Sequence, residues 1–379
     1  MSTAQRQTQG SYSNNRLARL RARMRELDLD AVLTLEPANA RWLSSWTEIF
    51  DDEPAHLVLV TRTKVYLHTD SRYSAAMQAK SKQGRWQVSD KSINHFAFAK
   101  NTLARLRKQE LRVGYEASIR LDLFKRLKKE FAHTSFKLVE TQDLFSSLRA
   151  VKDDEEVRLL KKAQNITDAA FKDLLTWVAP GMRELEVANR LEFVLRDLGG
   201  EGLAFATIAA SGPHSALPHA RPTSRRLRKG DFFVLDFGAR YRDYCADMTR
   251  TLVMGKATDK QHAIYNAVLA AQTRAKAGIR AGVTGKEAHD LANEVLRAEG
   301  LDKAFTHSLG HGVGIDVHEQ PLLSPYNTKP LVAGNVVTVE PGVYITGYGG
   351  VRIEDFGLVG ERGYTCFTRS PHELIEVKA

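Results

Sequence analysis

The C-terminal half of this 379-residue chain contains four acidic residues whose positions favour metal binding. Asp236 ends the strand-like run FFVLD, and Asp247 follows a polar turn near residues 239–243. In a hairpin with that centre, the two carboxylates lie about opposite each other. Facing carboxylates repel each other unless a cation lies between them, so the pair indicates a metal site.

A second acidic pair repeats this arrangement. Glu340 and Glu354 flank the glycine-rich turn of VTVEPGVYITGYGGVRIED. The segment HSLGHGVGIDVHE, between the two hairpins, contains His307, His311 and His318. Four carboxylates with imidazole form a hard, oxygen-rich ligand set, which suits two metal ions joined by bridging carboxylates. The set accepts Mn²⁺, Co²⁺, Fe²⁺ or Zn²⁺.

The elements that carry these residues are duplicated in the sequence. Three blocks match in the same order: 181–199 with 282–300 at an offset of 101, 217–222 with 316–321 at 99, and 230–238 with 334–342 at 104. This alignment places Asp236 in register with Glu340, and His219 with His318. A duplicated helix–strand unit can bring such pairs together across a pseudo-twofold axis.

The segment 150–370 resembles the pita-bread metallopeptidases, the fold of methionine aminopeptidase, aminopeptidase P and prolidase. The strings SGPHSALPHA, DFGARYRDYCADMTRT, HSLGHGVGIDVHE, VEPGVY and GGVRIED carry the resemblance. It implies five metal ligands: Asp236, Asp247, His311, Glu340 and Glu354. Asp247 and Glu354 would bridge two divalent ions, of which manganese is the first expectation. Asp236 would complete one ion, and His311 with Glu340 the other.

The resemblance also implies roles in catalysis and substrate binding. Glu340 is the expected proton shuttle to the leaving nitrogen. His318 would lie near the scissile carbonyl, and His219 or His318 could supply a donor to the oxyanion. His307 and His219 would line the substrate side. Arg352 would hold a carboxylate or orient the bridging acids. The alternatives are a core histidine for His307, and a structural ion pair with Asp355 or Glu354 for Arg352.

The N-terminal half is a different kind of domain. A helical pattern over 15–29, strand-like runs at 31–35 and 56–61, and a likely hairpin partner at 64–70 predict mixed α and β structure. RLARLRARMRELDLDAVLTLEPANARWLSSW and TDSRY resemble the N-terminal domain of prolidases, aminopeptidases P and creatinase. We therefore expect an α/β chain in three parts: a disordered lead (1–14), a creatinase-like domain (15–150) and a pita-bread catalytic domain (151–379).

The resemblance implies a proline-specific metallo-exopeptidase that cleaves the Xaa–Pro bond at the N-terminus of peptides or in dipeptides. Because that bond has no N–H and carries a fixed ring, peptidases that require the N–H do not cleave it. Two alternatives stay open. One is a methionine aminopeptidase or another amide hydrolase on the same site. The other is a non-catalytic protein that binds nucleic acid through the basic N-terminal domain.

Charge and composition limit the partners. The formal charge of +10 lies wholly in residues 1–150, which contain 26 Lys and Arg against 16 Asp and Glu, whereas the remainder contains 29 of each. Since no basic motif is interleaved with aromatic residues, we expect no nucleic-acid partner. No apolar run is long enough to span a bilayer, and no secretory signal is visible. With two cysteines, these features predict a cytoplasmic enzyme, and the resemblance implies a homodimer.

Overall fold

The computed structural model describes residues 3–378 except 48, 52, 54, 83, 84 and 107. It divides into two compact units, Met1–Arg149 and Ala150–Ala379. Each unit has its own sheets and its own buried core. Among the described residues, no helix is both long and apolar enough to cross a membrane.

The N-terminal unit is built on one six-stranded sheet of order β4-β3-β2-β1-β5-β6. Strands β1, β5 and β6 are parallel, whereas β2 is antiparallel to both β1 and β3, which confirms the predicted hairpin. Its strands are β1 Ala31–Thr34, β2 Leu57–Thr61, β3 Val65–His68, β4 Trp86–Ser89, β5 Leu111–Glu116 and β6 Phe136–Thr141. Its α-helices are α1 Thr3–Glu26, α2 Pro37–Ser44, α3 Ser71–Ser81, α4 His95–Leu103, α5 Leu121–Phe131 and α6 Leu144–Ala150.

Helix α1 starts at Thr3, so it runs through most of the segment 1–14 for which we expected no structure. The reason is tertiary rather than local. The Ser13 hydroxyl donates to the carbonyl of Leu43 at 2.7 Å, and Arg16 Nη1 donates to that of Trp42 at 2.8 Å. Both donors are buried, so these contacts with α2 stabilise the start of α1 as a helix. The sequence there is polar and lacks the helical spacing of apolar residues.

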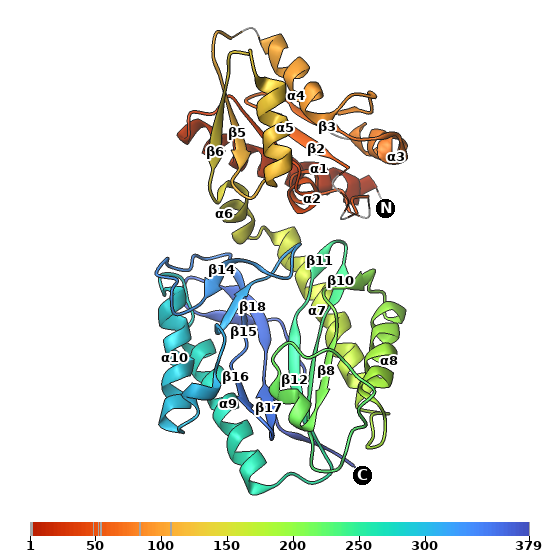
Figure 1. The fold of residues 1–379 in the computed structure, drawn as a ribbon, viewed down its shortest axis with the longest axis vertical. Helices are drawn as coiled ribbons and strands as arrows, with labels where there is room; N and C mark the ends of the chain where they lie inside the picture. Colours follow the sequence, from red (N-terminus) through yellow and green to blue (C-terminus); the bar gives the residue numbers. More distant parts are fainter. Residues whose placement is uncertain are drawn as a thin grey trace. The chain divides into compact units, whose positions relative to one another are not determined.

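The C-terminal unit packs four helices around two larger sheets, with α7 and α8 on one side and α9 and α10 on the other (Figure 1). The sheets have the orders β20-β12-β9-β8 and β14-β13-β15-β18-β19. The helices are α7 Asp154–Leu174, α8 Glu184–Asp197, α9 Asp259–Gly278 and α10 Gly285–Ala298. The strands are β7 Gly202–Leu203, β8 Ile208–Ser211, β9 Phe232–Phe237, β10 Ala239–Tyr241, β11 Tyr244–Cys245, β12 Met248–Met254, β13 Gly310–Gly312, β14 Glu319–Leu323, β15 Val336–Val339, β16 Gly342–Ile345, β17 Gly349–Arg352, β18 Asp355–Val359, β19 Tyr364–Cys366 and β20 Ile375–Val377.

The duplication predicted from the sequence is present in the backbone. Helices α8 and α10 each have 14 residues, and both begin with a capping-box glutamate at the third helical position. The glycines that flank them match in pairs: Gly181 (φ 93°) with Gly282 (φ 90°), and Gly199 (φ 97°) with Gly300 (φ 69°). These left-handed φ values favour glycine, so the same two turns recur in both copies.

Each copy buries its own helix pair against its own strands. In the first, Phe171 of α7 and Leu191 of α8 share a buried cluster with Phe233 and Leu252 of β9 and β12. In the second, α9, α10, β15 and β17 contribute Val268, Ala292, Val337 and Val351. Two rigid, fully packed layers therefore support the loops and strand ends that carry the predicted site.

Candidate metal centre

The first acidic pair lies where β9 passes into β12. Asp236 pairs with Thr249, and Asp247 immediately precedes β12. Asp247 is therefore two positions from Thr249, the residue opposite Asp236, because the hairpin turns at Arg242–Asp243, at the end of the predicted turn, where φ is 49° and 69°. Side chains two apart on a strand share a face, so Asp247 lies on the same side as Thr249 and Asp236.

The second acidic pair matches its prediction. Val339 pairs with Asp355 in the β15–β18 ladder, and Gly342 pairs with Arg352 in the β16–β17 ladder. Glu340 and Glu354 lie between these ladders and in the same register. They are therefore the opposed pair of the hairpin.

Hydrogen bonds join the two hairpins at the site. The backbone N–H of Glu354 donates to the carbonyl of Thr249 at 3.1 Å, and the Thr249 hydroxyl donates to Glu354 Oε2 at 2.7 Å. Farther along, the N–H of Arg352 donates to the Thr251 hydroxyl at 3.1 Å. Strand β12 of the first copy thus holds the second hairpin by its backbone, which brings acids of both copies to one place.

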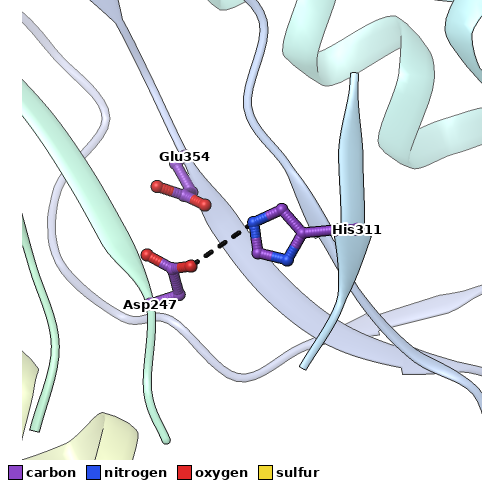
Figure 2. A group of neighbouring side chains, drawn as sticks. All are labelled: Asp247, His311 and Glu354. Carbon is purple, nitrogen blue, oxygen red and sulfur yellow. Dashed lines mark ion pairs between the residues drawn. The ribbon is translucent and has the colours of Figure 1, made fainter. Parts of the chain in front are cut away.

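Three predicted ligands, Asp247, His311 and Glu354, point toward one another (Figure 2). One ligand atom from each lies within 4.8 Å of the others. His311 Nε2 is 3.6 Å from Asp247 Oδ2 and 3.2 Å from Glu340 Oε1. His311 Nδ1 lies 3.1 Å from the carbonyl of Gly312, which can only accept a hydrogen bond, so Nε2 is the ring atom that faces the acids.

Burial and close contact shift the pKa values of the acids and the imidazole in this group. Burial, followed by repulsion from neighbouring carboxylates, raises the pKa of Asp247 and of Glu354 well above the usual range. Burial also raises the pKa of Asp236. For Glu340 the hydrogen bond and charge of His311 outweigh burial and lower the pKa to about 2. The same contact outweighs burial at His311 and raises the pKa of its imidazole.

Among the predicted ligands that the structure describes, two buried carboxylate oxygens have no hydrogen-bond partner. They are Asp236 Oδ1 and Glu354 Oε1, and both are buried. Buried carboxylate oxygens are normally paired, hydrogen-bonded or bound to a metal. Together with the converging acids and the imidazole Nε2, these free oxygens fit divalent cations.

Arg352 contacts an acid other than the two we considered. Its Nη2 lies 2.6 Å from Asp236 Oδ2, and its Nε donates to the Thr249 hydroxyl at 3.0 Å. Asp355, the partner we had weighed, instead pairs with Arg250 at 2.9 Å. Because the Arg352 guanidinium is buried among these partners, the contacts favour orientation of Asp236 over binding of a substrate carboxylate.

A cavity of about 810 Å³ opens onto the acids. His219, His307 and His318 line it with the five predicted ligands. The His318 ring packs edge-on against His311, with centroids 4.3 Å apart. His307 Nδ1 donates to the carbonyl of Ser308 at 2.8 Å, and its Nε2 is 3.0 Å from the Tyr344 hydroxyl. Both ring nitrogens of His307 are therefore engaged within the protein.

Three residues of the site were missed by sequence reasoning. Thr249 contacts Glu354 and Arg352, Thr338 donates to Glu340 Oε1 at 3.1 Å, and the Tyr344 hydroxyl accepts from Arg352 Nη1 at 2.5 Å. Strand alternation alone could have found Thr249 and Thr338, each two residues from a predicted ligand. No comparable signal marks Tyr344.

Comparison with known proteins agrees with this architecture. Residues 158–361 match the model of metallopeptidase family M24, and residues 16–151 match that of the creatinase/prolidase N-terminal domain. In sequence, the chain is 40% identical over 263 residues to an Xaa-Pro dipeptidase of Pyrococcus furiosus, which covers 69% of this chain and 75% of that protein.

Solved structures show the same fold over almost the full length. An Xaa-Pro dipeptidase from Bacillus anthracis superposes with a TM-score of 0.88 at 36% identity, covering 96% of this chain and 99% of that one. An X-Pro aminopeptidase from Thermotoga maritima gives 0.85 at 35% identity, covering 95% and 99%. The resemblance to pita-bread enzymes is thereby confirmed, and the chain belongs to metallopeptidase family M24, with a creatinase/prolidase-type N-terminal domain.

Proposed function

We propose that this protein is a proline-specific metallo-exopeptidase that hydrolyses the Xaa–Pro bond of dipeptides or of peptide N-termini. The observation that carries the proposal is the convergence of acids from both copies of the repeat, with unpaired buried oxygens, on one cavity. Membership of family M24 and the Xaa-Pro dipeptidases among the relatives supply the reaction class. Since the structural neighbours include both a dipeptidase and an aminopeptidase, dipeptides and longer peptides are both proposed as substrates.

Five residues are proposed to hold two divalent ions: Asp236, Asp247, His311, Glu340 and Glu354. Asp247 and Glu354 would bridge, as the resemblance implies, and manganese is the proposed metal. Such ions supply a nucleophile at neutral pH by lowering the pKa of bound water, and they polarise the scissile carbonyl. Arg352 contacts Asp236 Oδ2, which leaves Oδ1 of that carboxylate available to bind a metal ion.

The residues around the acids are proposed to bind substrate and move protons. Glu340 is proposed to accept a proton and pass it to the leaving nitrogen, from its place on the cavity wall beside the other predicted ligands. His318 and His219 face the same cavity and can donate to the developing oxyanion. His307 contributes its ring, because both of its nitrogens are bonded elsewhere.

The remaining proposals concern assembly, location and partners. A homodimer is implied by the resemblance alone. The cytoplasm is proposed because both cysteines are free thiols, Cys245 buried and Cys366 exposed. Small peptides are the proposed partners, because the relatives include dipeptidases. Size-exclusion chromatography with light scattering tests the dimer directly.

The test combines metal analysis with a substrate panel. The purified protein, reconstituted with Mn²⁺, Co²⁺, Fe²⁺ or Zn²⁺, is assayed on Xaa-Pro dipeptides, Xaa-Pro tripeptides and Met-Gly peptides. We expect metal-dependent cleavage of Xaa–Pro bonds and about two ions per chain. Preferential cleavage of Met-Gly peptides would contradict the proline specificity. Salt-sensitive nucleic-acid binding without turnover would contradict the assignment as an enzyme.

A further inference from the structure

One buried carboxylate outside the metal centre fastens both ends of a loop that lines the cavity. Glu184 is the first residue of α8 and is fully buried. Its Oε1 accepts from the N–H of Ser211 at 2.8 Å and from the Ser211 hydroxyl at 2.7 Å. Its Oε2 accepts from the N–H of Thr223 at 3.0 Å and from the Thr223 hydroxyl at 2.7 Å. His214 Nδ1 adds a fifth donor, 3.0 Å from Oε2.

The loop closed in this way is residues 211–223. It contributes Pro218, His219, Ala220, Arg221 and Pro222 to the wall of the cavity. The residue that fastens it is not itself part of that wall. Glu184 therefore acts on the site only through the loop.

The second copy of the repeat holds its corresponding segment differently. The residue that matches Glu184 at the offset of 101 is Gly285, where a Cβ atom would lie 2.2 Å from the carbonyl oxygen of Leu322. That close backbone approach leaves no room for a side chain. A buried glutamate at this position is therefore a feature of the first copy alone, and it serves the loop that carries His219.

We propose that Glu184 is a positioning residue of the peptidase site, which fixes loop 211–223 so that His219 is held against the substrate. The inference deepens the proposed function and rests on it. An acid in the first turn of a helix is ordinarily a surface residue that complements the helix dipole. Here its five donors all come from the loop rather than from the helix.

The loop has further supports, so loss of the carboxylate should loosen it without unfolding the unit. The N–H of Leu185 donates to the carbonyl of Thr223 at 3.1 Å. The N–H of Gly350 donates to the Ser215 hydroxyl at 2.9 Å, and Arg352 Nη1 donates to the carbonyl of Pro218 at 3.3 Å. Glu184→Gln preserves the shape and burial of the side chain. Its amide NH₂ cannot accept a hydrogen bond, so the donors at one end of the loop lose their acceptor.

The kinetic test is a double-mutant cycle on Xaa-Pro hydrolysis. We expect Glu184→Gln to lower kcat/KM about tenfold and to leave the metal content unchanged. A tenfold loss is smaller than the roughly hundredfold loss that a 1 Å misplacement can cause. In a His219→Ala background the same change should lower kcat/KM less than about twofold. The matched control is Glu186→Gln, on the same helix, whose carboxylate accepts only from its own helix end, and it should leave turnover unchanged. Equal losses in both backgrounds, or no loss in the first, would overturn the proposal.

A second readout does not depend on the substrate. Amide hydrogen exchange in residues 212–222 should be faster in Glu184→Gln, whereas α8 and β12 should be unchanged. Thr223→Val removes one donor at an exposed position and should give a smaller increase in exchange. Thr223→Ser keeps the hydroxyl and should show wild-type exchange. These two variants test the proposal even if Glu184→Gln does not fold. Unchanged exchange in an active enzyme contradicts the positioning role. Faster exchange in a protein that cleaves no Xaa–Pro bond contradicts the proposed function instead.

Discussion

Replacing a proposed metal ligand should stabilise the metal-free protein while destroying its activity. The perturbation is Asp247→Asn. Asp247 and Glu354 are both buried, and the atoms they offer lie within 4.8 Å of each other. In the metal-free protein their mutual repulsion opposes folding, whereas bound cations would turn the same proximity into a stabilising contact.

The size of the effect follows from this separation. Two unit charges 4.8 Å apart, the limit given by the structure, repel by roughly 3.5 kcal/mol at an effective dielectric constant of about 20. Burying a carboxamide with an imperfect partner costs about 1–1.5 kcal/mol. The net gain for metal-free Asp247→Asn is therefore about 2 kcal/mol at pH 8. For a unit of this size, Ala150–Ala379, this raises Tm by about 4–8 °C.

The stability difference between Asp247→Asn and wild type should depend on pH. Burial and the neighbouring carboxylates raise the pKa of Asp247 and Glu354 in the folded, metal-free protein. The folded state thus binds more protons than the unfolded chain above about pH 4, where an ordinary carboxyl titrates. Wild-type stability is fully present below that pH and is lost as the pH rises through the raised values. The advantage of Asp247→Asn should grow in the same direction and disappear at acid pH.

Differential scanning calorimetry of chelator-treated protein between pH 5 and 8.5 measures this effect on the C-terminal unit. Asp197→Asn, at an exposed position on α8, is the control and should change stability by less than about 0.5 kcal/mol. Adding Mn²⁺ should reverse the order, because only the wild-type site binds it tightly. The reasoning is refuted if metal-free Asp247→Asn is less stable than wild type by the same amount at every pH, since Asp247 would then stabilise the fold through packing or hydrogen bonds.

Three further predictions concern the same region. Glu354→Gln should abolish Xaa-Pro hydrolysis and lower bound metal, measured by a peptidase assay and elemental analysis; full activity would contradict its assignment as a ligand. Arg352→Lys keeps the charge but cannot reproduce the contacts of a planar guanidinium with Asp236 and the Thr249 hydroxyl, so kcat should fall at least about tenfold in the same assay. Arg250→Met removes one partner of Asp355, which keeps Lys276 and His372, and takes the side-chain donor from the carbonyls of Glu354 and Ser370. It should destabilise the C-terminal unit by about 3–5 kcal/mol in urea denaturation, and a change below about 1 kcal/mol would contradict this.

The sequence was most informative where the duplication repeats a chemical type. Asp236 and Glu340 each end a strand in matching blocks, and the strand register places Glu340 opposite Glu354 as predicted. The paired glycines around α8 and α10 were visible for the same reason, since a left-handed turn restricts the residue type. Register within the first hairpin was less accessible. The turn lies at the end of the predicted range, which places Thr249 rather than Asp247 opposite Asp236, and single-sequence patterns do not fix turn positions to that precision.

Contacts between distant segments could not be predicted. Arg352 and Asp236 are 116 positions apart, and their pairing follows from the crossing of two hairpins. The role of Glu184 could not be predicted either, because nothing in the local sequence shows that α8 begins against loop 211–223. The start of α1 also depends on contacts between distant segments, those of Ser13 and Arg16 with α2. No spacing of apolar residues at the start of the chain predicts them.

The histidine pair shows how a symmetric sequence can produce unequal roles. His219 and His318 occupy matching positions and line one cavity. The His318 ring packs on His311, a proposed ligand, whereas His219 lies on a loop whose ends both bind Glu184. Duplication therefore accounts for why two imidazoles reach the cavity, and the contacts around each account for why they should not act alike. Burial and the charge of His311 lower the pKa of His318, which favours the neutral imidazole beside the proposed ligands. The support of His219 is mechanical, through its loop, so its contribution depends on residues that touch neither metal nor substrate.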